Sequence, residues 1–213
     1  LRRSDMGSRF TGSDASAIFV EADTNAADVA SIAANQRPTG AFTINGTDAD
    51  SGAVVFASAR KVSVTTTSTN DVGKKATITG TDINGAVQSE ELTMLGSAAT
   101  VVGSLYFKTI SGAVVSAQPA QNVSLGMSDA VAINIYGGRA RLQGTFIVCS
   151  TSAGILNFVT TGSTGASQLK LGTVASNTVS RDVTIPDEGI LFTDGIFLLY
   201  DVADFANMTV FHA

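Results

Sequence analysis

The chain has 213 residues, of which 44% are hydrophobic and only 15% are charged, and it contains 21 glycines, 3 prolines and no tryptophan. This composition excludes a disordered or fibrous protein, and a net charge of −5 with dispersed basic residues argues against a nucleic-acid reader. No apolar run approaches the ~20 residues that a membrane-spanning helix needs. A folded chain of this size buries ~70% of its unfolded surface and two separate halves only ~65% each, so two domains are possible with little margin.

The first 40 residues differ from everything that follows. Residues 25–34 are rich in alanine, and the spacing of Val29, Ile32 and Ala33 permits one short helix, which Pro38 would end. We expect residues 1–40 to form an extended or short-helical N-terminal arm. Two alternatives stay open, because the arm can pack along the following domain or reach out to a neighbouring molecule.

From residue 41 onward the sequence is typical of β-structure. In residues 61–65 valines alternate with polar residues, which is the pattern of a half-buried strand. Asn84-Gly85 readily supplies the positive φ angles of a type I′ turn, and it predicts a hairpin that pairs residues 77–81 with residues 88–94. These patterns predict a first β domain over residues 41–128, with strands at residues 41–44, 54–56, 61–66, 76–81, 87–95, 101–110 and 122–125.

A second β region begins after turn-forming residues at 118–122 and 126–129. Short strands this closely spaced predict a sandwich or jelly roll over residues 129–213, and the boundary between the domains falls within residues 111–129. The fold class expected for the whole chain is therefore all-β, with two β-sandwich or jelly-roll-like domains behind the N-terminal arm. Strands are expected at residues 130–136, 142–149, 155–160, 168–174, 179–185, 189–192, 196–200 and 208–212.

Residue types that carry catalysis are scarce. The sole histidine, His212, lies one residue before the end of the chain and is interpreted as the end of a last strand. The sole cysteine, Cys149, lies in an apolar run and is expected to be buried. Glu90 and Glu91 are neighbours on a predicted strand, so they point to opposite faces and cannot form the facing pair of a glycosidase. We expect no enzyme, with no catalytic, cofactor-binding or metal-binding residues.

Three further segments resemble ligand sites only weakly. Residues 48–52 place two aspartates before a glycine, as in a calcium loop, but the other ligands are missing and a turn explains them. Asp194, Asp201 and Asp204 could meet at one end of the second domain, and an ion there is a minor alternative. Two glycines and two arginines in residues 137–141 predict a hairpin, because no strand-to-helix transition follows them.

One part of the chain resembles a known family. Residues 76–93 read Ala-Thr-Ile-Thr-Gly-Thr-Asp-Ile-Asn-Gly-Ala-Val-Gln-Ser-Glu-Glu-Leu-Thr, and Tyr-Phe-Lys-Thr-Ile follows at 106–110 and Asn-Val-Ser-Leu-Gly at 122–126. This pattern resembles a recurring β module of tailed-bacteriophage virion proteins. Upstream, residues 42–46 and 57–64 are similar to the segment that usually precedes this module, so the resemblance covers residues 41–126. A looser similarity to another small phage β module lies in residues 142–148, 185–192 and 194–198.

The resemblance implies a structural protein located in the virion, and it carries no catalytic residues. We favour a capsid decoration or cement protein that acts as a homo-oligomer, with its own copies and the major capsid or tail proteins as partners. Neither nucleic acid nor membrane is an expected partner. The segments expected to make these contacts are residues 9–18 of the arm and the loops at residues 160–167 and 193–195.

Two other functions stay open. Phage β modules of this kind occur in heads and tails alike, so the alternative is a tail component, either an adaptor or hub ring or a fibre-attachment protein. A third possibility, from another class, is a carbohydrate-binding β module. Sugar-binding surfaces of proteins usually present exposed aromatic rings. Because tryptophan is absent, only Tyr106, Tyr136 and Tyr200 would be available for such a surface.

Overall fold

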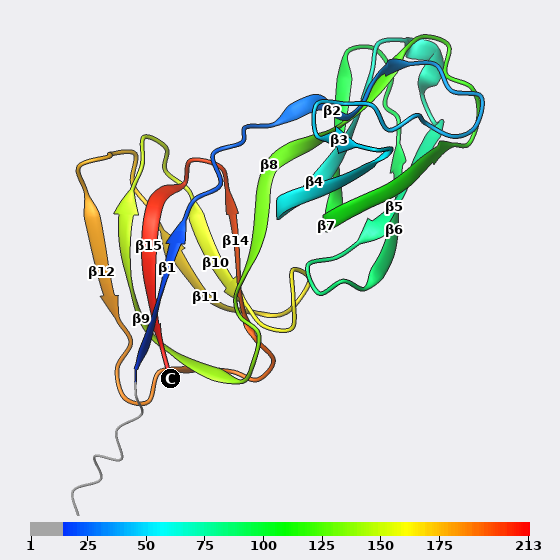
Figure 1. Cartoon of the computed structure of the whole chain (residues 1–213). Helices are drawn as coiled ribbons and strands as arrows, with labels where there is room; N and C mark the ends of the chain where they lie inside the picture. Colours follow the sequence, from blue (N-terminus) through cyan, green and yellow to red (C-terminus); the bar gives the residue numbers. More distant parts are fainter. Residues whose placement is uncertain (1–14) are drawn as a thin grey trace, which may run out of the picture.

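A computed structural model describes residues 15–213, and in them the predicted all-β fold class is confirmed (Figure 1). The only helical element in this part of the chain is a 3₁₀ turn at Thr69–Asp71, and none of it forms a helix long and apolar enough to cross a membrane. The strands are β1 (Ser16–Glu21), β2 (Asp28–Gln36), β3 (Ala49–Asp50), β4 (Ala53–Thr66), β5 (Lys75–Thr81), β6 (Val87–Thr93), β7 (Ala99–Val115), β8 (Val123–Tyr136), β9 (Ala140–Cys149), β10 (Ile155–Val159), β11 (Ser167–Gly172), β12 (Ser180–Thr184), β13 (Ile190–Phe192), β14 (Ile196–Asp201) and β15 (Phe205–His212).

These strands form two antiparallel sheets (Figure 1). The smaller sheet has the order β1-β15-β9-β12, with β13 also paired to β9. The larger sheet has the order β11-β10-β14-β8-β4-β7-β5-β6, with β2 paired to β8 and β3 to β4. Each strand predicted from residue 54 onward overlaps an observed strand, although β4 and β8 each merge two predicted ones. The strand predicted at residues 41–44 is wrong, because only an isolated bridge between Ala41 and Val114 forms there.

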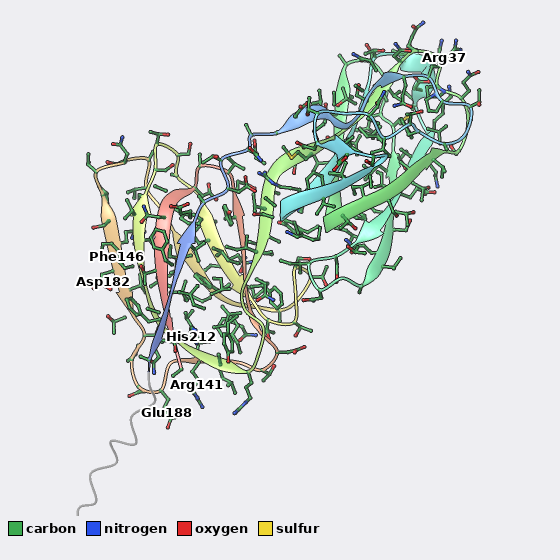
Figure 2. All side chains as sticks on the ribbon, viewed as in Figure 1. Arg37, Arg141, Phe146, Asp182, Glu188 and His212 are labelled. Carbon is green, nitrogen blue, oxygen red and sulfur yellow. The ribbon has the colours of Figure 1, made fainter. Side chains whose placement is uncertain are left out.

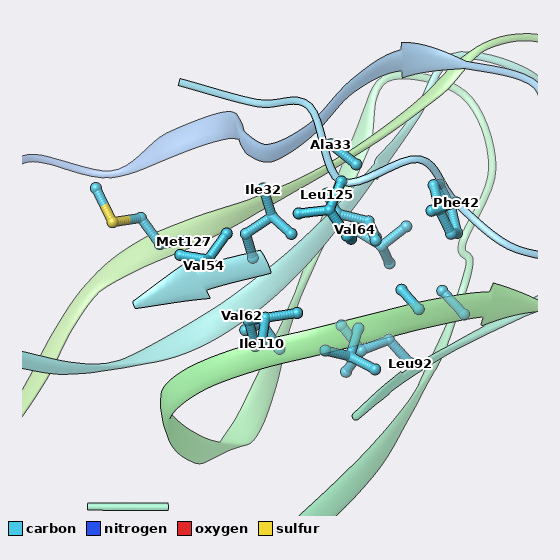
Figure 3. Packing of buried hydrophobic residues seen from close by; sticks show 14 of the residues in the cluster. Ile32, Ala33, Phe42, Val54, Val62, Val64, Leu92, Ile110, Leu125 and Met127 are labelled. Atoms are coloured by element: carbon cyan, nitrogen blue, oxygen red, sulfur yellow. The ribbon is translucent and has the colours of Figure 1, made fainter. Parts of the chain in front are cut away.

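Buried apolar side chains form two main clusters. The first cluster is formed by side chains between residues 32 and 127, and it packs against β2, β4, β5 and β7. Figure 3 labels ten of its residues. The second combines Val20 with residues 131 to 210, and it lies between the smaller sheet and the part of the larger sheet made by β8, β10 and β14. The two clusters therefore follow one another along the chain, apart from the contribution of Val20.

The molecule has two halves, one around the first cluster and one around the second, and strand β8 runs through both without interruption. It pairs with β4 from Val123 to Ala132 and with β14 from Ala130 to Tyr136. The turn predicted at residues 126–129 is therefore wrong. Gly126 is needed for another reason, because a Cβ there would overlap the backbone of β2 at the Asp28 carbonyl oxygen. A glycine that resembles a turn signal in the sequence marks a close approach of two backbones instead.

We expect Gly126→Ala to lower the free energy of unfolding by about 1–3 kcal/mol, because β2 must move away from β8 to make room. Urea denaturation followed by circular dichroism measures this change. Gly112→Ala is the matched control, since Gly112 also lies in a strand and a Cβ there would have no heavy atom within 4 Å. Similar losses of stability in the two variants would contradict the assigned role of Gly126.

The predicted short helix within residues 25–34 is also wrong. Residues 28–36 form β2, which lies along β8 with two irregularities in its register. These irregularities break the two-residue alternation, so the neighbouring Ile32 and Ala33 are both fully buried in the first cluster. Of the expected arm, the described part packs along its own chain, with β1 on β15 and β2 on β8. The remainder, residues 1–14, lies outside the described residues.

The hairpin predicted around Asn84-Gly85 is confirmed, but its turn type is wrong. Strands β5 and β6 pair from Lys75 opposite Thr93 to Thr81 opposite Val87. Gly85 has a φ of 83°, whereas Asn84 keeps a negative φ, and the Asp82 carboxylate accepts the N–H groups of Asn84 and Ala86. Because Asp82 supplies these bonds, one positive φ is enough to close the loop.

The predicted turn within residues 48–52 is confirmed between β3 and β4. Ser51 and Gly52 have φ angles of 52° and 84°, the two successive positive values that tight hairpins favour. The Asp50 carboxylate accepts the Ser51 hydroxyl at 2.9 Å. The residues that echoed a calcium loop therefore form a two-residue hairpin connection.

Candidate functional site

A buried charged network joins the two halves of the molecule. Arg60 on β4 is only 1% exposed, and its Nη2 lies 2.8 Å from Oδ1 of Asp23, whose side chain is 9% exposed. The guanidinium also donates to the carbonyl oxygens of Asn25 at 2.7 Å and Ser128 at 3.3 Å. On the other side, the Asp23 N–H donates to the Tyr200 hydroxyl at 3.0 Å. The network therefore fixes the connection between β1 and β2 against β4, β8 and β14.

A cleft of about 580 Å³ opens beside this network, between β7 and the strands β10, β11 and β14. Burial, and then the nearby charge of Asp201, raise the pKa of Tyr106 to about 12, so its phenol stays neutral. The Lys61 ammonium lies 5.0 Å from the centre of the Tyr106 ring. The cleft is lined by Tyr106, Ala153, Gly154, Ile155, Asn157, Lys170, Leu199, Tyr200, Asp201 and Asp204. The cleft offers hydrogen-bond donors and acceptors, and its charged side chains include both positive and negative ones.

Asp204 in this cleft has a structural role. Its Oδ2 accepts the Asp201 N–H at 2.9 Å, and a Cβ on Gly154 would overlap its carboxylate. Burial raises the pKa of Asp204, and the negative charge of Asp201 acts in the same direction. The carboxylate therefore fastens the turn between β14 and β15 to the start of β10.

Of the three aspartates that could meet at one end of the second domain, only two lie together. Asp201 and Asp204 lie together, but Asp194 precedes the opposite end of β14. Within residues 15–213, no three His, Cys, Asp or Glu side chains form a group that could hold a metal ion. The minor alternative of an ion bound by all three aspartates therefore does not fit the geometry of these described residues.

The single histidine and cysteine occupy the positions that the sequence predicts. His212 ends β15, is buried, and has its ring centre 4.6 Å from that of Tyr136, while Cys149 is fully buried with a free thiol. Tyr106 and Tyr200 are buried as well, which leaves only Tyr136 partly exposed. Three tyrosines in these positions do not form the exposed stacking platform that a sugar-binding surface uses.

The two adjacent glutamates point to opposite faces, as predicted. Glu91 pairs with Lys75 at the exposed outer strand β6. The Glu90 carboxylate accepts the N–H and hydroxyl of Ser104 and the N–H of Leu105. It therefore satisfies backbone N–H groups of β7 at residues 104 and 105, which have no partner residue on β4 or β5.

The two loops expected to contact neighbours touch each other and the first half of the chain. The Thr161 N–H donates to the Asp194 carbonyl at 2.9 Å, which joins the loop after β10 to the turn before β14. A Cβ at Gly162 would lie 2.9 Å from Nδ2 of Asn84, in the turn between β5 and β6. Figure 1 shows the loop after β10 beside the turn between β5 and β6. Part of their surface is therefore already used within the chain.

An exposed aromatic surface lies on the outer face of the smaller sheet. Phe19 on β1, Phe146 on β9 and Phe211 on β15 are 60%, 40% and 36% exposed, and we call this set the aromatic face. Thr209 lies opposite both Phe19 and Phe146, which places these rings in one row across the sheet. Figure 2 shows Phe146 beside Asp182, its partner position on β12. Their neighbours on the inner face, such as Val20 and Ile147, are buried.

The sequence did not identify the aromatic face. Phe19 lies between Ile18 and Val20, and Phe146 precedes an apolar run, so neither pattern tells which side chain points outward. The rim of the sheet is polar, with Arg141 and Glu188 paired at 3.2 Å (Figure 2).

No protein-family model matches this chain, and no curated protein matches it. The resemblance of residues 41–126 to the phage β module therefore stays a prediction from the sequence pattern.

Proposed function

We propose that this chain is a non-enzymatic structural protein of a tailed-phage particle, which decorates or cements the capsid through contacts between copies and with the capsid shell. The aromatic face is the observation that carries the proposal. Three partly exposed phenylalanines on one sheet face are unusual for a surface that remains in water, and such patches commonly mark protein contacts. With only 15% charged residues in the chain, few charges have to be desolvated when that surface is covered.

The internal contacts of the phage-like pattern support its treatment as one module. Gly80, in the Thr-Gly-Thr segment, has no room for a Cβ because the Thr109 carbonyl oxygen lies against it. The hydroxyls of Thr81 and Thr109 are 2.7 Å apart, while Phe107 and Ile110 are buried in the first cluster. Segments that are distant in the sequence pattern are thus direct neighbours in the fold.

The test uses capsids that lack this protein, assembled from the major capsid protein of the same genome. We expect the purified chain to co-sediment with them saturably and to raise the temperature at which they break open. Phe146→Ser should weaken binding at least about tenfold, as loss of a buried aromatic anchor does. Val87→Ser, at an exposed position on β6 far from the aromatic face, is the matched control and should bind normally.

Other outcomes decide between the remaining roles. Binding to isolated tails and not to capsids would replace the decoration role with that of a tail component. Binding to neither structure would contradict a virion role altogether. Unchanged capsid binding by Phe146→Ser would show that the aromatic face is not the contact surface.

A further inference from the structure

One edge of the smaller sheet is open. Strand β1 pairs with β15 on one side, and within residues 15–213 no strand pairs with its other side. The Ala22 N–H donates to the Ala206 carbonyl, so by strand alternation Ala17, Phe19 and Glu21 present their backbone groups to the open side. Asp23 follows the same alternation, since its N–H points away from β15 to the Tyr200 hydroxyl. The open edge therefore ends where Tyr200 begins to cover it.

The charges on β1 differ from those on the strands that end the two sheets elsewhere. β12 carries Arg181 and Asp182, β11 carries Lys170, and β6 carries Glu90 and Glu91. Charged side chains within an outer strand hinder its pairing with another chain. β1 has only small and apolar side chains up to its last residue, a glutamate. Among the four strands at the ends of the two sheet orders, β1 is the one without this protection; β13, which pairs only with β9, is also uncharged but has only three residues.

A second copy of β1 fits this edge in one antiparallel register. With a two-fold axis at Phe19, the two Phe19 residues lie opposite each other, and Ala17 lies opposite Glu21 in both directions. All three residues that face the open side then form hydrogen-bonded pairs. Ile18 lies opposite Val20 on the inner face, next to the second cluster. The two Glu21 carboxylates are placed at opposite ends of the paired strands, where they repel each other least.

We propose that β1 is a dimerisation edge, through which two copies of this chain join their smaller sheets into one continuous antiparallel sheet. The pairing covers part of the most exposed ring of the aromatic face, because each Phe19 gains the other as its cross-strand neighbour. A second copy of the chain is the proposed occupant of this edge, because in a two-fold contact each copy presents the same strand to the other. The inference specifies the oligomeric contact of the proposed function, but it is tested on purified protein without capsids, so its failure is distinguishable from failure to bind them.

Sedimentation equilibrium over a wide range of protein concentration tests the proposal. We expect a monomer–dimer equilibrium for the unchanged chain. Phe19→Lys places two like charges opposite each other and should raise the dissociation constant at least about tenfold. Ala17→Pro removes an N–H that β15 does not use, so it should weaken the dimer while circular dichroism shows a folded monomer. Val87→Lys, which adds the same charge to the outer strand β6, is the matched control and should dimerise normally.

Cysteine cross-linking tests the register. In Phe19→Cys the two new thiols face each other, with Cα atoms about 5.5 Å apart, which is within disulfide range. In Ala17→Cys they lie about 13 Å apart along the strand and should not cross-link. Cys149 is fully buried and does not compete. A chain that stays monomeric at every concentration, unaffected dimers of Phe19→Lys and Ala17→Pro, or equal cross-linking at the two positions would each overturn the proposal.

Discussion

Replacing Arg60 with methionine is expected to lower the free energy of unfolding by about 3–5 kcal/mol. The change leaves the Asp23 carboxylate, whose side chain is 9% exposed, without its cationic partner. It also removes the donor to the carbonyl oxygens of Asn25 and Ser128, which join the connection between β1 and β2 to β8. Urea denaturation of the variant and of the unchanged chain, extrapolated to water, measures the difference.

An exposed ion pair provides the comparison. Lys75→Met breaks the pair with Glu91 at the surface of β5 and β6, and it should change stability by less than about 1 kcal/mol. Adding Asp23→Asn to Arg60→Met should recover part of the loss, because the carboxylate that lacked a partner is then neutral. If Arg60→Met were as mild as Lys75→Met, the buried network would not be holding the two halves together.

The largest loss among apolar positions is expected for Phe107→Ala, at about 3–5 kcal/mol. Phe107 lies on β7, is fully buried, and belongs to the first cluster. Its removal leaves a cavity that the strands around it cannot close, because β7 pairs with β4 on one side and β5 on the other. Thermal unfolding followed by circular dichroism and urea denaturation should both report the loss.

The neighbouring residue is the matched control for this variant. Lys108 lies on the opposite face of β7, and its ammonium donates to the Ala57 carbonyl at 2.6 Å in a solvent-exposed setting. Lys108→Ala should therefore change the free energy of unfolding by no more than about 1 kcal/mol. A smaller loss for Phe107→Ala than for Lys108→Ala would mean that the face assignment of this strand is incorrect.

The β-structure could be predicted from the sequence where strands keep a regular alternation. Residues 61–65 alternate valines with polar side chains, and β4 places the valines inside. The prediction failed where irregular register hides the alternation, as in β2, whose buried pair Ile32 and Ala33 fits a helix equally well. It failed at Gly126 too, since a glycine has the same local appearance in a turn as in a strand that another backbone crosses.

The candidate site was harder to predict because its parts depend on distant partners. Nothing near Arg60 in the sequence shows that it is the buried member of the Arg60-Lys61 pair, and its partner Asp23 comes from a different segment. Phe19 is flanked by two other apolar residues, so only the tertiary fold determines that its ring faces outward. The roles of His212 and Cys149, in contrast, follow from strand position and apolar context alone.

The uninterrupted strand β8 has a mechanical consequence. Force applied between the two halves does not meet a slack connector, since the covalent chain that joins them is also hydrogen-bonded to β4 in one half and to β14 in the other. Pulling along β8 loads many backbone hydrogen bonds in shear at the same time, so they resist together. Bending at the junction would therefore have to distort or break hydrogen bonds of β8, which a flexible linker does not require.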